Sequence, residues 1–419
     1  MTHRFRFWRA GIALLVVCAG CAREVPPPSP VTFALSDRTN YTPWVASAGS
    51  FVAVVWGASV DDRADVMLAV SRDNGRTFAA PVRVNAVAGD ARLSGEIPPR
   101  VMVSPGSSSG VDPVVTVVWN AKDRGTEIKA ATSHDGGRTF AAPTSLQKPE
   151  AAGDRGWHAA TLDDRGAVHT LWLDHRGLAT DGTSGAGHHG EHDGVAMAQK
   201  SGLYYSSGPS HGERELFKGV CYCCKTAMAT GATGEIYAAW RHVFAGNMRD
   251  MAFTVSRDGG RSFEPLVRVH EDQWSINGCP DDGPAMAAAP SGSIHLVWPT
   301  VLKGTVGALH YAWSDDGRTF TPPVVVPTLG TSRPSHAHIA IDARGRVMVA
   351  WDELVKGSRT AVTREVRRAG SRIEFGPAIT LDEAGPAMYP VLAAVADGWL
   401  AVWTRGGTPS TVRGRVLTE

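Results

Sequence analysis

Apolar runs alternate with polar turns along the chain from residue 31 onward, and seven of these runs end in tryptophan. Each run has about six residues rich in Val, Ala, Ile and Leu, the pattern of a buried β-strand bounded by turns. The tryptophans recur at intervals of 52 to 68 residues. The seven runs cover residues 51–56, 113–119, 167–172, 235–240, 293–298, 346–351 and 398–403.

A period of this length indicates a repeat architecture. In the first unit, a strand near Trp44 precedes residues 51–56, a third strand covers residues 65–71, and residues 81–84 form a fourth. Four-stranded antiparallel units that bury both faces against their neighbours make a β-propeller. We therefore predict an all-β fold, a β-propeller of four-stranded antiparallel blades, with seven blades favoured and six as the alternative.

A turn motif repeats between the third and fourth strands of four units. It is SRDNGRTF at residues 71–78, SHDGGRTF at 133–140, SRDGGRSF at 256–263 and WSDDGRTF at 313–320. In such a turn an aspartate accepts hydrogen bonds from the backbone, a glycine supplies a positive φ, and the phenylalanine packs beneath the turn. We expect these aspartates to be structural and not catalytic: Asp73, Asp135, Asp258 and Asp315.

The two ends of the chain are predicted to share one blade. After the last tryptophan run only one further strand fits, at residues 410–417, so the last unit is one strand short. Residues 31–35 (VTFAL) can supply the missing strand. This pairing would close the ring and leave no exposed sheet edge in the last blade.

The repeated motif S-x-D-x-G-x-x-F resembles the Asp-box (BNR) repeats of sialidase-like propellers, and the resemblance covers nearly all of the chain after residue 30. It implies the propeller fold and raises exo-sialidase activity as a hypothesis. The family's sialidases have six blades, so a count of seven is a departure. Fold alone does not fix function.

A sialidase of this kind would need three arginines that clamp a substrate carboxylate and a tyrosine nucleophile. The family's first clamp arginine lies in an Arg-Ile-Pro motif, but the similar string here, residues 96–100 (EIPPR), has glutamate in that place. The remaining candidates for a hydrolytic site are Tyr389, Arg333 and Arg100.

The first thirty residues carry an export signal. Arg4, Arg6 and Arg9 precede an apolar run at residues 11–19 that is too short to span a bilayer as a helix. We expect a lipoprotein signal peptide at residues 1–20, a proline-rich tether at residues 21–30 and the propeller at residues 31–419.

The end of the signal, residues 18–21 (CAGC), resembles a lipobox, in which Cys21 would become the lipidated first residue. An ordinary cleaved signal peptide is the alternative. Because Ala22 follows the cysteine, the resemblance implies an outer-membrane lipoprotein that faces the periplasm. The membrane is then one expected partner, held through the N-terminal lipid.

Charge excludes one class of partner. The formal net charge is +1 and charged residues make up 20% of the chain. A balanced chain of this kind has no basic surface for nucleic acid, so no nucleic-acid partner is expected.

Four cysteines outside the signal form the most unusual feature of the sequence: Cys221, Cys223, Cys224 and Cys279. Residues 221–224 precede the inner strand of one unit, and Cys279 precedes the inner strand of the next. Ring symmetry therefore predicts that the two cysteine segments are neighbours at one mouth of the propeller's central channel. An exported protein with an even number of cysteines favours disulfides, and Cys279 paired with one of the other three is the natural link. The alternative is a copper or zinc site, with Met228 and Met286 as possible further ligands.

The same alignment of units places several other side chains at that mouth, where loops on a rigid frame form binding sites. Besides Arg100 and Tyr389, these are His158, His336 and His338. A second possible metal site is the insertion at residues 174–198, because histidine-rich tracts chelate metals by composition alone. Its candidate ligands are His188, His189 and His192, and the alternative is a solvated loop.

Two hypotheses of function follow. The first is an envelope-anchored, sialidase-like propeller that acts as a ligand-binding or scaffold protein for a glycan or an envelope protein, with a metal site at the channel mouth as a possible addition. The alternative is a glycoside hydrolase that resembles exo-α-sialidases.

Overall fold

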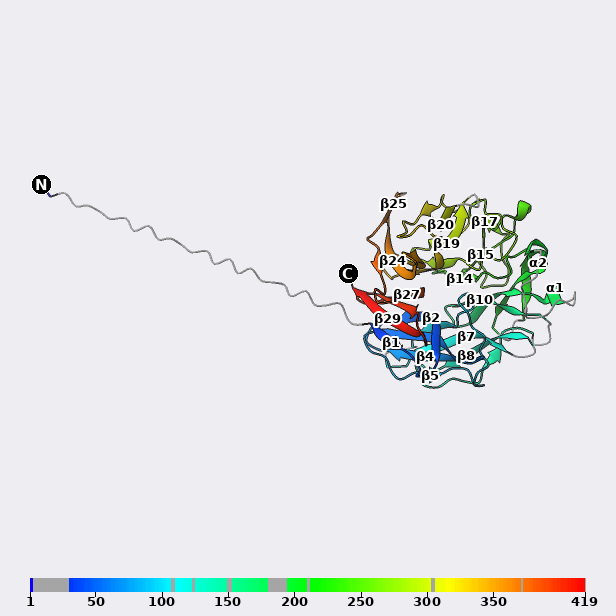
Figure 1. The fold of residues 1–419 in the computed structure, drawn as a ribbon, viewed down its shortest axis with the longest axis horizontal. Coiled ribbons are helices and arrows are strands. Elements are labelled where there is room, and N and C mark those ends of the chain that lie inside the picture. The colour runs from blue at the N-terminus through cyan, green and yellow to red at the C-terminus, as the bar shows by residue number, and fades with distance from the viewer. Residues whose placement is uncertain are drawn as a thin grey trace.

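The computed structural model forms a ring of seven β-sheets, which confirms the prediction of a seven-bladed β-propeller (Figure 1). It describes residues 1–2, 30–106, 110–122, 125–148, 153–179, 194–208, 212–302, 306–370 and 372–418. In Figure 1 the strands β2, β10, β14 and β27 lie toward the middle of the ring, whereas β5, β17 and β25 lie at its periphery.

The first four blades each contain four consecutive antiparallel strands. Blade 1 is β2 (Thr39–Ala48), β3 (Phe51–Val60), β4 (Arg63–Ser71) and β5 (Val82–Arg83). Blade 2 is β6 (Arg100–Ser104), β7 (Val114–Lys122), β8 (Thr126–Ser133) and β9 (Thr144–Ser145). Blade 3 is β10 (Arg155–Leu162), β11 (Val168–Asp174), β12 (Gly202–Ser207) and β13 (Arg214–Lys218). Blade 4 is β14 (Ala227–Thr230), β15 (Ile236–Arg241), β16 (Met251–Ser256) and β17 (Val267–Arg268).

The remaining blades complete the ring. Blade 5 is β18 (Ala285–Ala288), β19 (Ile294–Leu302), β20 (Val306–Ser314) and β21 (Val324–Val325). Blade 6 is β22 (Ser335–Ile341), β23 (Val347–Val355), β24 (Ser358–Ala369) and β25 (Arg372–Phe375), with β26 (Ile379–Thr380) also on β24. Blade 7 is β27 (Ala387–Val395), β28 (Gly398–Arg405), β29 (Thr411–Thr418) and β1 (Val31–Phe33).

Short helical segments interrupt blades 3 and 4. They are α1 (Arg176–Ala179), α2 (Gly194–Lys200) and the 3-10 turn η1 (Ala245–Asn247). Among the described residues no helix is long and apolar enough to cross a membrane.

The tryptophan runs are the second strands of the blades, and their indoles form the core. All seven tryptophan side chains are fully buried between blades: Trp56, Trp119, Trp172, Trp240, Trp298, Trp351 and Trp403. Most of the indole N–H groups donate to a polar side chain, for example Trp351 to Glu353 at 2.8 Å. Burial of an aromatic side chain of this size, with its N–H satisfied, stabilises a blade interface by about 2–3 kcal/mol.

The ends of the chain close blade 7 as predicted. Val31 pairs with Gly414 and Phe33 with Val412 in an antiparallel ladder. Phe33 is buried and its ring lies 4.8 Å from the ring of Phe78, which belongs to the first Asp-box turn. The N-terminal strand therefore both completes a sheet and packs into the neighbouring blade.

The Asp-box turns lie at the end of the blades opposite the mouth, because they follow the third strands. In the first box, Ser71 donates to Asp73 over 2.7 Å, and the backbone N–H of Thr77 donates to the same carboxylate over 2.9 Å. Residues 133–139 and 256–262 repeat this geometry. These hydrogen bonds lower the pKa of the turn aspartates and fix the turn.

The fourth box corrects one sequence assignment. Ser314 and the backbone N–H of Thr319 donate to Asp316, at 2.8 and 2.7 Å, and not to Asp315. Asp315 instead forms an ion pair with Arg368 at 2.8 Å. The box has one residue fewer between its serine and its glycine than the other three, so alignment on glycine and phenylalanine selected the wrong aspartate.

Candidate functional site

Four inner strands carry the same irregularity where they enter the channel mouth. In β2, β10, β22 and β27 the ladder slips, and one residue has a positive φ. These residues are Thr42, Trp157, His336 and Tyr389, with φ between 46° and 55°. Positive φ is costly for β-branched and bulky residues, and bulges re-aim side chains next to functional sites.

One buried carboxylate holds two of these residues together. Asp352, on β23, accepts a hydrogen bond from His336 Nδ1 at 2.7 Å and another from the backbone N–H of Tyr389 at 2.8 Å. Arg359 forms an ion pair with its other oxygen at 3.0 Å. As a result the imidazole and the phenol lie with their ring centroids 4.1 Å apart.

Their surroundings set the protonation of both groups. Burial would lower the pKa of His336, but the carboxylates of Asp352 and Asp282 outweigh it and raise that pKa. Burial, reinforced by the charge of Asp352, raises the pKa of Tyr389 to about 12. At neutral pH the phenol is therefore protonated, and the imidazole keeps its proton more readily than a free histidine does.

A small pocket lies beside this pair, and both residues line it. Its wall combines an aromatic face from Trp44, the ring pair of His336 and Tyr389, and the ammonium-bearing Lys225. Gly95 and Pro98 also line it. A Cβ atom at Gly95 would lie 2.2 Å from the ring of Tyr389, so only glycine fits against the phenol there.

The loop that contains Gly95 crosses the mouth of the channel. Its Glu96 side chain is buried and accepts hydrogen bonds from the backbone N–H groups of Lys225, at 2.8 Å, and Gly283, at 3.1 Å. The ammonium of Lys225 lies 3.4 Å from the same carboxylate. Burial raises the pKa of Glu96, but the charge of Lys225 and these hydrogen bonds lower it overall. The loop from blades 1 and 2 is thereby tied to blades 4 and 5.

The entry to blade 5 carries a second carboxylate pair at the mouth. Asp282 accepts from the backbone N–H of His336 at 3.0 Å and pairs with Arg333 at 2.9 Å. Burial and the nearby charge of Glu96 raise the pKa of the adjacent Asp281 to about 6. Asp281 can therefore exchange a proton near neutral pH.

The structure does not bring all of the predicted mouth residues to the pocket surface. Arg100 is buried, its guanidinium lies 3.6 Å from the ring centroid of Trp44, and its Nε donates to the backbone oxygen of His158. It therefore cannot form the arginine clamp that a sialidase would require. Tyr389 is at the mouth as expected, and Arg333 is near it but already paired with Asp282.

Two of the predicted histidines are buried and neutral. His158 shares a hydrogen bond of 2.8 Å with Asn120, and His338 accepts from the backbone N–H of Leu392 at 3.2 Å. Burial, with the charge of Arg100, lowers the pKa of each to about 3. Of the three histidines expected at the mouth, His336 alone has the partly exposed, charge-surrounded position of a reactive group.

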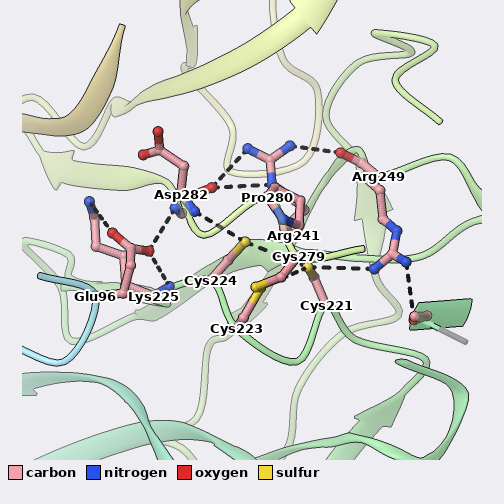
Figure 2. Close-up of a disulfide and its surroundings, with 12 residues drawn as sticks. Glu96, Cys221, Cys223, Cys224, Lys225, Arg241, Arg249, Cys279, Pro280 and Asp282 are labelled. Atoms are coloured by element: carbon pink, nitrogen blue, oxygen red, sulfur yellow. Dashed lines mark hydrogen bonds and ion pairs between the residues drawn. A yellow bond between two sulfur atoms is a disulfide. The ribbon is translucent and has the colours of Figure 1, made fainter. Parts of the chain in front are cut away.

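The four cysteines lie together beside Asp282 (Figure 2). Cys223 and Cys279 form a disulfide with a Cα separation of 6.1 Å. Cys221 and Cys224 are free, buried thiols whose sulfur atoms lie 3.5 Å apart. The backbone N–H of Asp282 donates to the sulfur of Cys224 at 3.5 Å, so the sulfur cluster directly supports the carboxylate that pairs with Arg333.

Other predicted residues lie elsewhere. Met228 and Met286 pack into two separate apolar cores. Cys21 and the histidines His188, His189 and His192 lie outside the described residues, as do the proposed signal peptide and most of the tether. These predictions therefore stay predictions.

Several residues of the site escaped the sequence analysis. Glu96 stood in the string EIPPR, which was compared with a clamp-arginine motif, and Asp352 directly follows a core tryptophan. Asp282 and Lys225 lie close to the cysteines in sequence but belonged to no motif, and Arg359 carried no pattern. The one usable signal was position, because Asp281, Asp282 and Lys225 precede inner strands just as the cysteines do.

No protein-family model and no curated protein matches the chain. Among solved structures, a protein of unknown function from Dyadobacter fermentans DSM 18053 is 15% identical, with a TM-score of 0.53 over 94% of this chain and 100% of that one. An ulvan lyase from a new family of polysaccharide lyases is 9% identical, with a TM-score of 0.55 over 93% and 96%. A Hadza microbial sialidase is 13% identical, with a TM-score of 0.47 over 90% and 66%. Identities this low show a shared fold.

Proposed function

We propose that the channel mouth binds an acidic polysaccharide and cleaves it, with Tyr389 as the proton donor and His336 as the group that neutralises the sugar carboxylate. The observation that carries the proposal is the shared carboxylate of Asp352. It accepts from the imidazole and from the backbone of the tyrosine, and so fixes two proton-carrying side chains at the wall of one pocket. An orienting third group of this kind is typical of catalytic sites.

The roles follow from the protonation states. The phenol of Tyr389, with its pKa near 12, is a proton donor to a leaving glycosidic oxygen. The imidazole of His336, whose pKa is raised by its carboxylate neighbours, can carry the positive charge that neutralises a sugar carboxylate next to the scissile bond. Asp281, with its pKa near 6, is a candidate to accept a proton.

The composition of the pocket fits an acidic sugar. Trp44 and Tyr389 contribute aromatic rings to its lining, and His336 contributes a basic imidazole. The ammonium of Lys225 also lines the pocket, although it is paired with Glu96. The ulvan lyase, which shares this fold, has been seen bound to a GlcA(1-4)Rha3S unit. At 8% identity that observation concerns the ulvan lyase, and it supports our choice of substrate class only through the fold.

Sialidase activity is the second candidate, and the structure gives it less support. Arg100 is buried, and the guanidiniums of Arg333 and Arg359 are paired with Asp282 and Asp352. A free arginine clamp for a sialic-acid carboxylate is therefore not formed by these three residues.

The test is a turnover assay of the purified full-length protein on uronate-containing polysaccharides. New reducing ends report any cleavage, and ultraviolet absorbance of an unsaturated product reports elimination. Tyr389→Phe and His336→Asn should each abolish turnover, whereas Tyr204→Phe, in blade 3, should leave it unchanged. Full activity of Tyr389→Phe would overturn the proposal. Cleavage of a fluorogenic sialoside instead would favour the sialidase hypothesis, and binding without turnover would favour a ligand-binding protein.

We also propose that the protein is held at the envelope through Cys21. The support is the lipobox-like string alone. Cys21→Ser should move the protein from the membrane fraction to the soluble periplasmic fraction or leave it uncleaved. Unchanged fractionation of this variant would exclude lipid anchoring at Cys21.

A further inference from the structure

Three cysteine side chains converge on one point beside Asp282, at the entry to blade 4. The sulfur atoms of Cys221, Cys223 and Cys224 all lie within 4.8 Å of one another. The sulfur of Cys221 is 3.5 Å from that of Cys224 and 4.0 Å from that of Cys223. All three residues are at most 5% exposed, so their sulfur atoms share one enclosed space.

Two buried guanidiniums accompany these sulfurs (Figure 2). Arg249 donates to the sulfur of Cys221 at 3.6 Å and otherwise to Asn247 and a backbone oxygen. Arg241 donates only to backbone oxygens, those of Asp282, Arg249 and Pro299. Within the described part of the chain, neither has a carboxylate at ion-pair distance.

Buried cations without a carboxylate are costly unless another negative charge is near them. The thiols are the groups that can supply this charge. Arg249 donates directly to the sulfur of Cys221, which lies 3.5 Å from the sulfur of Cys224. The cluster is therefore suited to hold thiolates, the form of cysteine that binds metal ions.

The disulfide can be opened from solvent. Cys279 is exposed, although its partner Cys223 is buried. A dithiol reductant that attacks the sulfur of Cys279 forms a mixed disulfide and releases the sulfur of Cys223. The second thiol of the reductant then frees Cys279, so that two electrons and two protons pass to the protein and the reductant leaves as its own disulfide.

We propose that Cys221, Cys223 and Cys224 form a three-thiolate site for a soft monovalent cation, Cu(I), once the Cys223–Cys279 disulfide is reduced. Thiolates select Cu(I) among the common cations. Three thiolates and one Cu(I) carry a net charge of −2, which the guanidiniums of Arg241 and Arg249 balance. A divalent ion with the same three ligands would leave the two positive charges partly uncompensated. The site is independent of the polysaccharide proposal.

Two substitutions distinguish a metal ligand from a residue that only forms the disulfide. Cys223→Ser and Cys279→Ser remove the same disulfide, but only Cys223 is a proposed ligand. The full-length protein and both variants are titrated anaerobically with Cu(I) against a Cu(I)-specific chelator, with and without prior reduction by dithiothreitol and its removal. Circular dichroism and thermal melting show whether each variant is folded.

We expect the oxidised protein to bind no Cu(I) in this competition and the reduced protein to bind one ion per chain. Cys279→Ser should bind one ion without reduction, whereas Cys223→Ser should bind none in either state. X-ray absorption of the loaded protein should show a first shell of three sulfurs.

The proposal is overturned if folded Cys279→Ser and Cys223→Ser bind the same amount of Cu(I). It is also overturned if the reduced protein cannot take Cu(I) from the chelator. A four-sulfur shell, or a preference for Zn(II) that requires Cys279, would equally overturn it. Polysaccharide turnover is not a readout of this test, so the two proposals fail separately.

Discussion

The two ends of the propeller use charged residues in opposite ways. At the Asp-box end, each turn aspartate is near solvent and accepts several short hydrogen bonds from its own turn. At the mouth, Glu96, Asp282 and Asp352 are buried, and each accepts from a blade other than its own. The first arrangement repeats because four blades use the same turn between their third and fourth strands. The second does not repeat, and its bonds join different blades around one pocket.

The largest effect should come from opening the ring. Deletion of residues 31–36 removes the ladder of β1 with β29 and the buried ring of Phe33. Unpaired backbone groups and lost apolar burial should leave little folded protein, measured by circular dichroism and urea unfolding. A chain that starts at residue 30 is the control and should be as stable as the longer one. Equal stability of the deletion variant would show that the propeller does not depend on the pairing of β1 with β29.

At the mouth, Glu96→Gln should be the most costly single substitution. It leaves the buried ammonium of Lys225 without its carboxylate, which costs about 3 kcal/mol. Because the folded-state pKa of Glu96 is lowered, its contribution is present above the unfolded pKa near 4.3 and is lost as the pH falls through the folded value. Urea unfolding should therefore show a larger loss of stability in the variant, relative to the parent, at pH 7 than at pH 3. If the free energy of unfolding falls at pH 7 by no more than it does for an Asp-box variant, the buried carboxylates of the mouth are no more important for stability than the turn aspartates.

Acid should also weaken the mouth through its neutral histidines. His158 and His338 have folded-state pKa values near 3, below the unfolded value of about 6.5, so the unfolded chain binds more protons as the pH falls. Each histidine should then cost about 2 kcal/mol at pH 5 relative to pH 8. His338→Gln should flatten this slope, and substitution of the exposed His134 should not. A parent protein with the same free energy of unfolding at pH 5 and pH 8 would contradict this prediction.

The smallest effect is expected at the Asp-box end. Asp73→Asn keeps the turn's shape but weakens the hydrogen bonds from Ser71 and Thr77. Because the turn is near solvent, water replaces much of what is lost, and the melting temperature should fall less than for Glu96→Gln. Asp315→Asn is the matched control, since Asp316 holds the fourth turn. If Asp315→Asn lowers the melting temperature more than Asp316→Asn does, Asp315 is the turn aspartate of the fourth box, as the motif predicted.

The sequence predicted what repeats and missed what does not. The buried indoles recur in each blade and the glycine turns in four of them, so period and spacing indicated seven blades, and the strand count at the two ends indicated the pairing that closes blade 7. Glu96 bonds to residues 129 and 187 positions away, and no period relates such partners. Ring symmetry could place the cysteine segments side by side, but it could not show that Arg100, His158 and His338 point into the core. Their burial depends on the neighbours Trp44 and Asn120, which differ from blade to blade.

The pairing of β1 with β29 also affects when the chain can fold. Val31 is made long before its partner Gly414. Blade 7 cannot close until its last strand has been made, and contacts so distant in sequence form slowly. If the first residues direct export, this delay would keep the chain threadable through a translocation pore, and the ring would shut on the far side of the membrane.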